Sequence, residues 1–198
     1  MNPRRRTLPS SAIFAAALGV FGCGSEDESS GLIVQDAIAS VKINEALARN
    51  NPTYGKAQDE YGEYDDWIEL LNTGSEEARL GGFWLSDSPR DPLRTQLPGW
   101  VSLAPGQRML LWADDQEYQN SDKGVHLGFR LGATDGDDVV LSGPDGERMD
   151  YLRVPAQPEG DVAPVSAARC PDGSGKLKLC NRPTPDGPNT SCCEEIEP

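Results

Sequence analysis

The sequence predicts an all-β protein, built as a sandwich or a barrel. Runs of four to eight residues rich in apolar side chains recur along the chain, and turn-forming Gly, Pro, Asn and Asp residues separate them. No stretch keeps the 3.6-residue apolar period of an amphipathic helix over several turns, and no heptad repeat is present. With 198 residues the chain is long enough to bury a core without a structural metal.

The predicted strands begin at residue 41 and continue to residue 154. In chain order they cover residues 41–45, 67–71, 80–85, 108–113, 125–131, 138–141 and 148–154. Between them, Pro105-Gly106 fits a type II turn, because proline sets φ at the first central position and glycine supplies a positive φ at the second. The Pro-Asp-Gly segment at residues 144–146 fits the loop of a hairpin.

The run that starts at Trp67 predicts a central strand. Successive side chains of a strand point to opposite faces, so Ile68 and Leu70 share one face. Trp67, Glu69 and Leu71 then share the other face. Both faces are largely apolar, which favours a strand whose second face is also partly covered.

Most of the four tryptophans are expected in the core, because each can bury about 150–250 Å². Phe83 and Leu85 share one face of their predicted strand, and Trp84 lies on the other. Trp100 differs from the rest, because it follows Pro98-Gly99 in a predicted loop. It is therefore our candidate for an exposed aromatic platform that binds a sugar or a peptide.

Several segments, in one order along the chain, are similar to the blocks of a known family. Residues 41–45 and 66–72 resemble the opening of the lamin tail domain, an immunoglobulin-like β-sandwich. Further similar blocks follow in the expected order at residues 80–87, 97–107, 126–131 and 137–146. Near the end, residues 166–175 and 184–189 resemble the closing blocks of bacterial members.

This resemblance implies a domain organisation and a lack of catalysis. We expect an immunoglobulin-like β-sandwich over residues 40–154. Residues 155–198 form an extension rich in Pro, Gly and Cys. Its first part continues the closing blocks of the domain, and the rest is expected to be irregular and held by disulfides. The family is not catalytic in itself, and its bacterial members look like accessory modules beside hydrolases.

The N-terminal 22 residues predict an export signal. Arg4, Arg5 and Arg6 precede an apolar run at residues 12–21. A helix of ten residues is about 15 Å long, half of the membrane hydrocarbon thickness of about 30 Å, so this run is too short to span. The following Cys23 resembles the acylated cysteine of the bacterial lipobox. The alternative is an ordinary signal peptide followed by a cysteine without that role.

The predicted lipid on Cys23 would hold the protein at the cell envelope. Residues 23–39 are small, polar and acidic, and they lack the side chains to form a core, so they are expected to act as a flexible tether. Gly24 stands where some inner-membrane lipoproteins have Asp, which favours the outer membrane.

The charge of the chain argues against nucleic-acid binding. There are 18 basic and 32 acidic residues, a formal charge of -14. Removal of the signal takes away three arginines and no acid, which leaves 15 basic and 32 acidic residues and a charge of -17. Binding to nucleic acid requires clustered Lys and Arg that neutralise phosphates.

Four cysteines besides Cys23 predict two disulfides in an oxidising compartment; they are Cys170, Cys180, Cys192 and Cys193. A bridge between the adjacent Cys192 and Cys193 is disfavoured by ring strain. Cys170 therefore pairs with one of these two and Cys180 with the other, in an order that the sequence leaves open. A redox or zinc site is the alternative, but the C-x-x-C spacing of such sites is absent.

An acidic segment before the Trp67 strand is a candidate Ca²⁺ site, because hard cations collect carboxylates on loops. Its candidate ligands are Asp59, Glu60, Glu63, Asp65 and Asp66. Their spacing does not match an EF-hand, and the competing interpretation is a solvated acidic loop. No other metal and no cofactor is expected.

No catalytic motif is present, and the chain's one histidine, His126, lies within a predicted strand, where a structural role is expected. We therefore expect a membrane-anchored, non-catalytic module that binds an extracytoplasmic protein. The alternative is a Ca²⁺-dependent or aromatic-platform adhesion module that binds a carbohydrate or cell-wall polymer. A hydrolase that uses Asp/Glu pairs ranks last.

Overall fold

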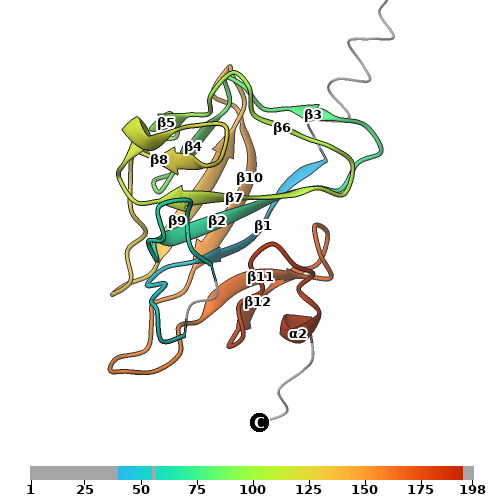
Figure 1. Ribbon diagram of the computed structural model, residues 1–198. Coiled ribbons are helices and arrows are strands. Elements are labelled where there is room, and N and C mark those ends of the chain that lie inside the picture. The colour runs from blue at the N-terminus through green and yellow to red at the C-terminus, as the bar shows by residue number, and fades with distance from the viewer. Residues whose placement is uncertain (1–39, 55–56, 194–198) are drawn as a thin grey trace, which may run out of the picture.

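The computed structural model describes residues 40–54 and 57–193, and Figure 1 shows their arrangement. The predicted signal peptide, Cys23 and the predicted tether lie outside these residues. The described part is an all-β sandwich, as the sequence predicts.

The larger sheet has six strands in the order β12-β11-β1-β2-β7-β8. In chain order these are β1 (Val41–Leu47), β2 (Asp66–Asn72), β7 (Arg108–Ala113), β8 (Val125–Leu127), β11 (Ser166–Cys170) and β12 (Lys176–Cys180). All neighbours pair antiparallel except β7 and β8, which are parallel.

The smaller sheet has four strands in the order β10-β9-β4-β5. They are β4 (Trp84–Ser86), β5 (Thr95–Gln96), β9 (Asp137–Ser142) and β10 (Arg148–Val154). A separate pair joins β3 (Ala78–Arg79) to β6 (Ser102–Leu103), and two short helices, η1 (Glu117–Gln119) and α2 (Thr190–Cys193), complete the described elements.

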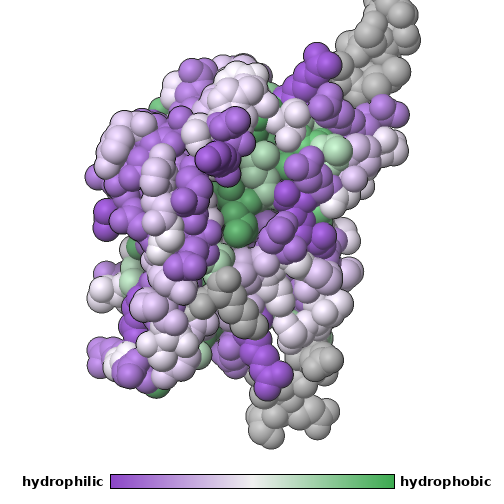
Figure 2. Space-filling view, in the orientation of Figure 1, coloured by the Kyte–Doolittle hydropathy of each residue, from purple (hydrophilic) through white to green (hydrophobic). Residues whose placement is uncertain are grey.

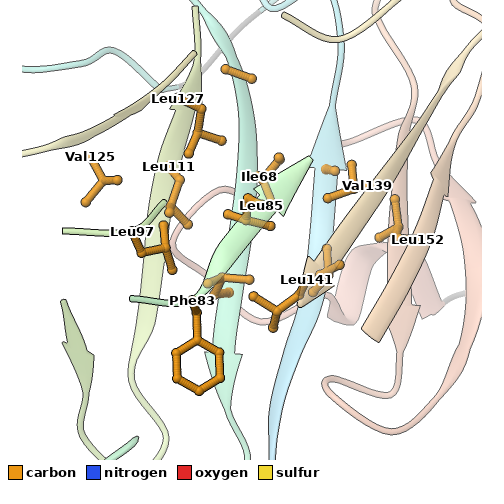
Figure 3. Packing of buried hydrophobic residues seen from close by; sticks show 14 of the residues in the cluster. Ile68, Phe83, Leu85, Leu97, Leu111, Val125, Leu127, Val139, Leu141 and Leu152 are labelled. Atoms are coloured by element: carbon orange, nitrogen blue, oxygen red, sulfur yellow. The ribbon is translucent and has the colours of Figure 1, made fainter. Parts of the chain in front are cut away.

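Apolar side chains from both sheets meet in one main core (Figure 3). Ile68 and Leu111 of the larger sheet lie opposite Leu85, Val139 and Leu141 of the smaller one. All five are at most 1% exposed. This burial is the main stabilising contribution, at about 25 cal/mol for each Å² of apolar surface removed from water.

The central position predicted for the Trp67 strand is confirmed. β2 lies between β1 and β7. Ile68 and Leu70 face the main core, whereas Trp67 belongs to a second cluster on the outer face of the sheet. There it stands directly opposite Trp112 of β7. Both faces of β2 are covered, which explains its nearly continuous apolar sequence.

A β-bulge in β1 interrupts the alternation of inward- and outward-facing side chains that the sequence of this strand suggests. The register with β2 shifts between Ile43 and Glu45, so Asn44 is an extra residue. Val41 and Ile43 face the core before the bulge, and Ala46 and Ala48 face it afterwards. Asn44 and Glu45 are therefore both free to contact the C-terminal extension.

Both predicted turns are confirmed. At Pro105-Gly106, the Gln107 N–H donates to the Ala104 carbonyl, and Gly106 has a φ of 72°. In the β9–β10 hairpin, the Gly143 N–H donates to the Glu147 carbonyl, and Gly146 has a φ of 83°. These positive φ values are favourable for glycine and costly for residues with a Cβ.

Two predicted strands are shorter than expected. In the segment 80–85, the strand begins only at Trp84, because Phe83 N–H closes a turn onto Leu80. In the segment 125–131, β8 ends at Leu127, and the next N–H, that of Gly128, donates to the Thr95 hydroxyl instead of continuing the ladder.

The C-terminal extension contains two strands and a short helix, where an irregular tail is expected from the sequence. β11 and β12 form a hairpin, and β11 pairs with β1, so the larger sheet continues beyond residue 154. The small side chains of Ala167 and Ala168 allow β11 to be covered on both faces. Outside β11, β12 and α2 the described part of the extension is irregular, and the extension is held by disulfides, as expected.

The surface seen in Figure 2 is mainly hydrophilic, and hydrophobic residues are visible from its centre toward the upper right. No helix among residues 40–54 and 57–193 has the length and apolar character needed to cross a membrane.

Candidate functional site

The acidic segment lies in a loop that crosses the outer face of the larger sheet. Ala57 packs with Leu47, Trp67 and Trp112 and so attaches the loop to the sheet. The side-chain amide of Asn50 donates to the carbonyls of Ala57 (2.9 Å) and Asp65 (3.1 Å). The two ends of the acidic segment are thereby held close together.

Asp59 is the most buried acid of this loop, at 8% exposure. Its Oδ1 accepts the N–H groups of Tyr61 (2.9 Å) and Glu63 (2.7 Å), and Gly62 takes a φ of 83° in the turn between them. Its other oxygen, Oδ2, is buried without a hydrogen-bond partner. A buried carboxylate oxygen in this condition costs free energy unless a cation or proton reaches it.

Two further acids of the loop approach Asp59. One ligand oxygen from each of Asp59, Glu63 and Asp65 lies within 4.8 Å of the others. Asp65 Oδ2 is also buried without a hydrogen-bond partner. Burial, and then the negative charges of Asp114, Glu63 and Asp59, raise the pKa of Asp65 above its usual value.

The other two predicted Ca²⁺ ligands point elsewhere. Glu60 accepts a hydrogen bond from the Ser121 hydroxyl (3.0 Å) and approaches His126. Asp66 accepts the N–H groups of Arg49 (2.6 Å) and Leu131 (3.2 Å), and burial raises its pKa to about 6. Of the five candidates, therefore, three come together.

The parallel pair β7–β8 brings two residues to this loop that are distant from it in the sequence. Asp114 follows β7, and His126 lies on β8 opposite Trp112. The two side chains are fully buried, and His126 Nδ1 lies 2.6 Å from Asp114 Oδ2. Ligand atoms of both residues come within 4.8 Å of Asp59.

The second ring nitrogen of His126 is also occupied, because Nε2 lies 3.4 Å from Glu60 Oε2. Burial lowers the pKa of His126, but the hydrogen bond to Asp114 and the charges of Asp114 and Glu60 outweigh it, so the net pKa is raised. His126 is thus held between two carboxylates, as a structural histidine would be. No local sequence pattern links it to Asp59, since strand pairing alone brings them together.

Comparison with known families identifies the domain. The model of the lamin tail domain family matches residues 35–155, more than half of the chain. The chain belongs to the lamin tail domain family. A comparison with curated proteins found no match. The lamin tail domain is an immunoglobulin-like domain that is not known as catalytic.

The acidic loop and His126 lie within the residues that match the lamin tail domain, whereas β11 and β12 lie beyond them. Two disulfides hold this added part. Cys170 pairs with Cys193, and Cys180 pairs with Cys192. The structure therefore decides between the two pairings that the sequence leaves open. One bridge joins β11 to α2, and the other joins β12 to α2.

A second group of buried acids lies between the lamin tail domain and its extension. Glu45 accepts hydrogen bonds from Ser166 and from the Thr184 hydroxyl (2.8 Å). Its cross-strand neighbour Glu69 accepts from the Asn44 amide (2.8 Å) and the Asp186 N–H (2.8 Å). Each carboxylate thus ties the sheet to the extension.

Burial raises the pKa of Glu69 to about 7, with a further contribution from the charge of Glu45. Burial also raises the pKa of Glu45. Cys180 and Cys192 lie near Glu45, but their sulfurs are joined in a disulfide and so are not thiolate ligands. This group therefore holds the extension in place and is not a metal centre.

Trp100 lies in a turn of the lamin tail domain and is 49% exposed. Trp67 and Trp112 are buried, and Trp84 is partly buried. Trp100 is thus available for the platform role, which stays a prediction.

Proposed function

We propose that this lamin tail domain protein is exported, anchored by lipid at Cys23, and binds an extended segment of a partner protein without catalysis. The two disulfides support export, because disulfides persist in oxidising compartments. The family's lack of known catalytic members supports a binding role. So does His126, whose two nitrogens face carboxylates and not a nucleophile.

The anchor is tested by Cys23→Ser. We expect this variant to move from the membrane fraction to the soluble fraction, because each buried CH₂ of an acyl chain contributes about 0.8 kcal/mol to membrane binding. A chain with 32 acidic residues gains no attraction from anionic headgroups that would replace the lipid. The measurement is immunoblotting of separated fractions, with Cys180→Ser as a control for loss of a cysteine elsewhere. A Cys23→Ser variant that stays with the membrane would refute the anchor.

The observation that carries the binding role is the outer edge of β12. This strand ends the larger sheet, and no other strand of the described residues pairs with its far side. Leu179 is 65% exposed and Leu177 is 39% exposed. Leu179 pairs with Ala167, and Ala167 faces the main core. Leu177 and Leu179 therefore lie on the core-facing side of the larger sheet, but at its edge, where their side chains remain exposed.

The chemistry of this edge selects one kind of partner. Lys176 and Lys178 alternate with the two leucines, which gives a basic, apolar edge on a chain of net charge -14. An extended peptide added to the edge would form main-chain hydrogen bonds with β12. Apolar side chains on one face of that peptide would cover Leu177 and Leu179, and acidic ones would face the lysines.

A photo-crosslinking residue at position 179 tests this surface in cells. We expect a discrete adduct at position 179 and none at Leu93, a matched control that is 44% exposed. The crosslinked segment should alternate apolar and acidic residues. A synthetic peptide of that segment should bind the purified chain, and Lys176→Glu should weaken its binding at least tenfold. A peptide whose affinity is unchanged by Lys176→Glu would contradict the proposal.

A second candidate function is adhesion to a cell-wall polymer, which the half-exposed Trp100 favours. Aromatic side chains of this kind present an apolar surface at low entropic cost. Retention on peptidoglycan beads that is lost in Trp100→Ala, without a crosslink at position 179, would favour adhesion over peptide binding.

A further inference from the structure

We propose that Asp59, Glu63 and Asp65 bind a calcium ion, at a site separate from the β12 edge. The three carboxylates already lie together, each with an oxygen within 4.8 Å of the other two. Ca²⁺ takes about six to eight oxygen ligands. The three carboxylates, each binding through one or both oxygens, would supply part of this number, and waters or carbonyls would supply the rest.

The unpartnered oxygens are independent of the clustering and point to a missing positive charge. Asp59 is nine-tenths buried, and its Oδ2 has no hydrogen-bond donor. Asp65 Oδ2 is in the same condition. The Asp59 Oδ1, in contrast, is fully used in holding the turn at Tyr61 and Glu63. One oxygen of Asp59 thus builds the loop, and the other is left for a ligand.

The surrounding charges favour a divalent cation. The Asp114 carboxylate lies close to Asp59 and adds a further negative charge at this group, and Arg130 is the basic side chain that acts on Asp65. Mutual repulsion of these acids raises the free energy of the site without a cation. A bound divalent ion would remove much of this repulsion, so its binding stabilises the folded loop.

The donor set favours Ca²⁺ over a transition metal. Zn²⁺ and similar ions prefer imidazole or thiolate ligands. The one imidazole nearby, that of His126, already has Nδ1 on Asp114 and Nε2 near Glu60. A transition metal at Asp59, Asp114 and His126 would have to break the 2.6 Å contact between His126 Nδ1 and Asp114 Oδ2. The Oδ2 atoms of Asp59 and Asp65, in contrast, have no hydrogen bond to break.

Calorimetric titration of the full-length chain in detergent, after treatment with a chelator, tests the site. We expect one Ca²⁺ per chain with a Kd of about 0.1–1 mM, the range of extracellular modules. Asp59→Asn and Asp65→Asn should each weaken binding at least tenfold. Asp59→Asn keeps an oxygen for the Tyr61 and Glu63 N–H groups, so the turn is retained. Asp135→Asn, at an exposed acid of another turn, is the matched control and should bind normally.

Thermal unfolding provides a second readout. Ca²⁺ should raise the midpoint of the wild-type chain and of Asp135→Asn, and should leave Asp59→Asn and Asp65→Asn unchanged. A single cooperative unfolding transition of each of the four proteins in chelator would show that the variants fold. Lys176→Glu should bind Ca²⁺ normally, which separates this site from the partner surface.

Three results would overturn the proposal. The first is no heat and no midpoint shift at several millimolar Ca²⁺. The second is equal loss of affinity in Asp135→Asn and Asp59→Asn, which would indicate unspecific charge binding. The third is a site that takes Zn²⁺ or Mn²⁺ in preference to Ca²⁺ and is lost in His126→Gln.

Discussion

Replacing Cys170 and Cys193 together by alanine should lower the free energy of unfolding by about 3 kcal/mol. These cysteines are 23 residues apart, and their bridge fixes the end of β11 to α2. Loss of the bridge gives the unfolded chain more conformational freedom. It also loosens Asn189, which precedes α2 and whose amide donates to the carbonyls of Asn44 (3.2 Å) and Arg169 (3.0 Å).

Denaturant unfolding of the double-alanine variant measures this change. Replacing Cys180 and Cys192, which are only 12 residues apart, should cost slightly less, because the entropy of closing a loop rises with the logarithm of its length. Hydrogen exchange should show faster exchange in β11 and β12 of both variants and little change in β9. An unchanged midpoint in both variants would mean that the two bridges contribute nothing to stability.

Raising the pH from 5 to 8 should destabilise the protein by about 3 kcal/mol through Glu69 alone. Burial raises the pKa of this carboxyl to about 7 in the folded chain, from 4.5 in the unfolded chain. Between these values the unfolded chain loses the proton while the folded chain keeps it. The contribution of Glu69 is therefore complete below pH 4.5 and is lost as the pH rises through 7. Asp66, with a pKa of about 6, acts in the same direction at lower pH.

Urea unfolding at several pH values, compared between wild type and Glu69→Gln, isolates this effect. The variant should lose most of the difference between pH 5 and pH 8, and it should be more stable than wild type at pH 8. Glutamine keeps an oxygen to accept from the Asn44 amide. The exposed Glu147→Gln is the control and should follow the wild-type profile. A Glu69→Gln variant that loses as much stability between pH 5 and pH 8 as the wild type would contradict the role of Glu69.

The sandwich could be predicted because its central strands carry strong local patterns. In β2 the side chains of Ile68 and Leu70 alternate with Trp67 and Glu69, and this period of two survives in the structure. β12 alternates Lys and Leu in the same way and could have been recognised. β11, with the sequence Ser-Ala-Ala-Arg-Cys, has no such pattern, because its small residues are selected by close packing on both sides.

The candidate site was only partly predictable for a different reason. Asp59, Glu63 and Asp65 are close in sequence, so a loop was enough to bring them together. Asp114, which follows β7, and His126, on β8, come 55 and 67 residues after Asp59 in the chain. Their approach depends on the parallel pairing of β7 and β8, and Glu60 turns toward His126 only because of it. Asp66 is close to Asp65 in sequence but does not join the acidic group, because its carboxylate accepts the N–H groups of Arg49 and Leu131.

The pairing of β1 with β11 determines when the larger sheet can finish folding. Glu45 and Ser166 meet on these strands although 121 residues separate them in the chain. β1 therefore acquires this neighbour only after the chain has been synthesised as far as β11. Contacts between such distant segments slow folding, because a long loop must close before they form. Slow completion of the sheet is compatible with the export proposed above, in which the polypeptide would cross the membrane before it folds.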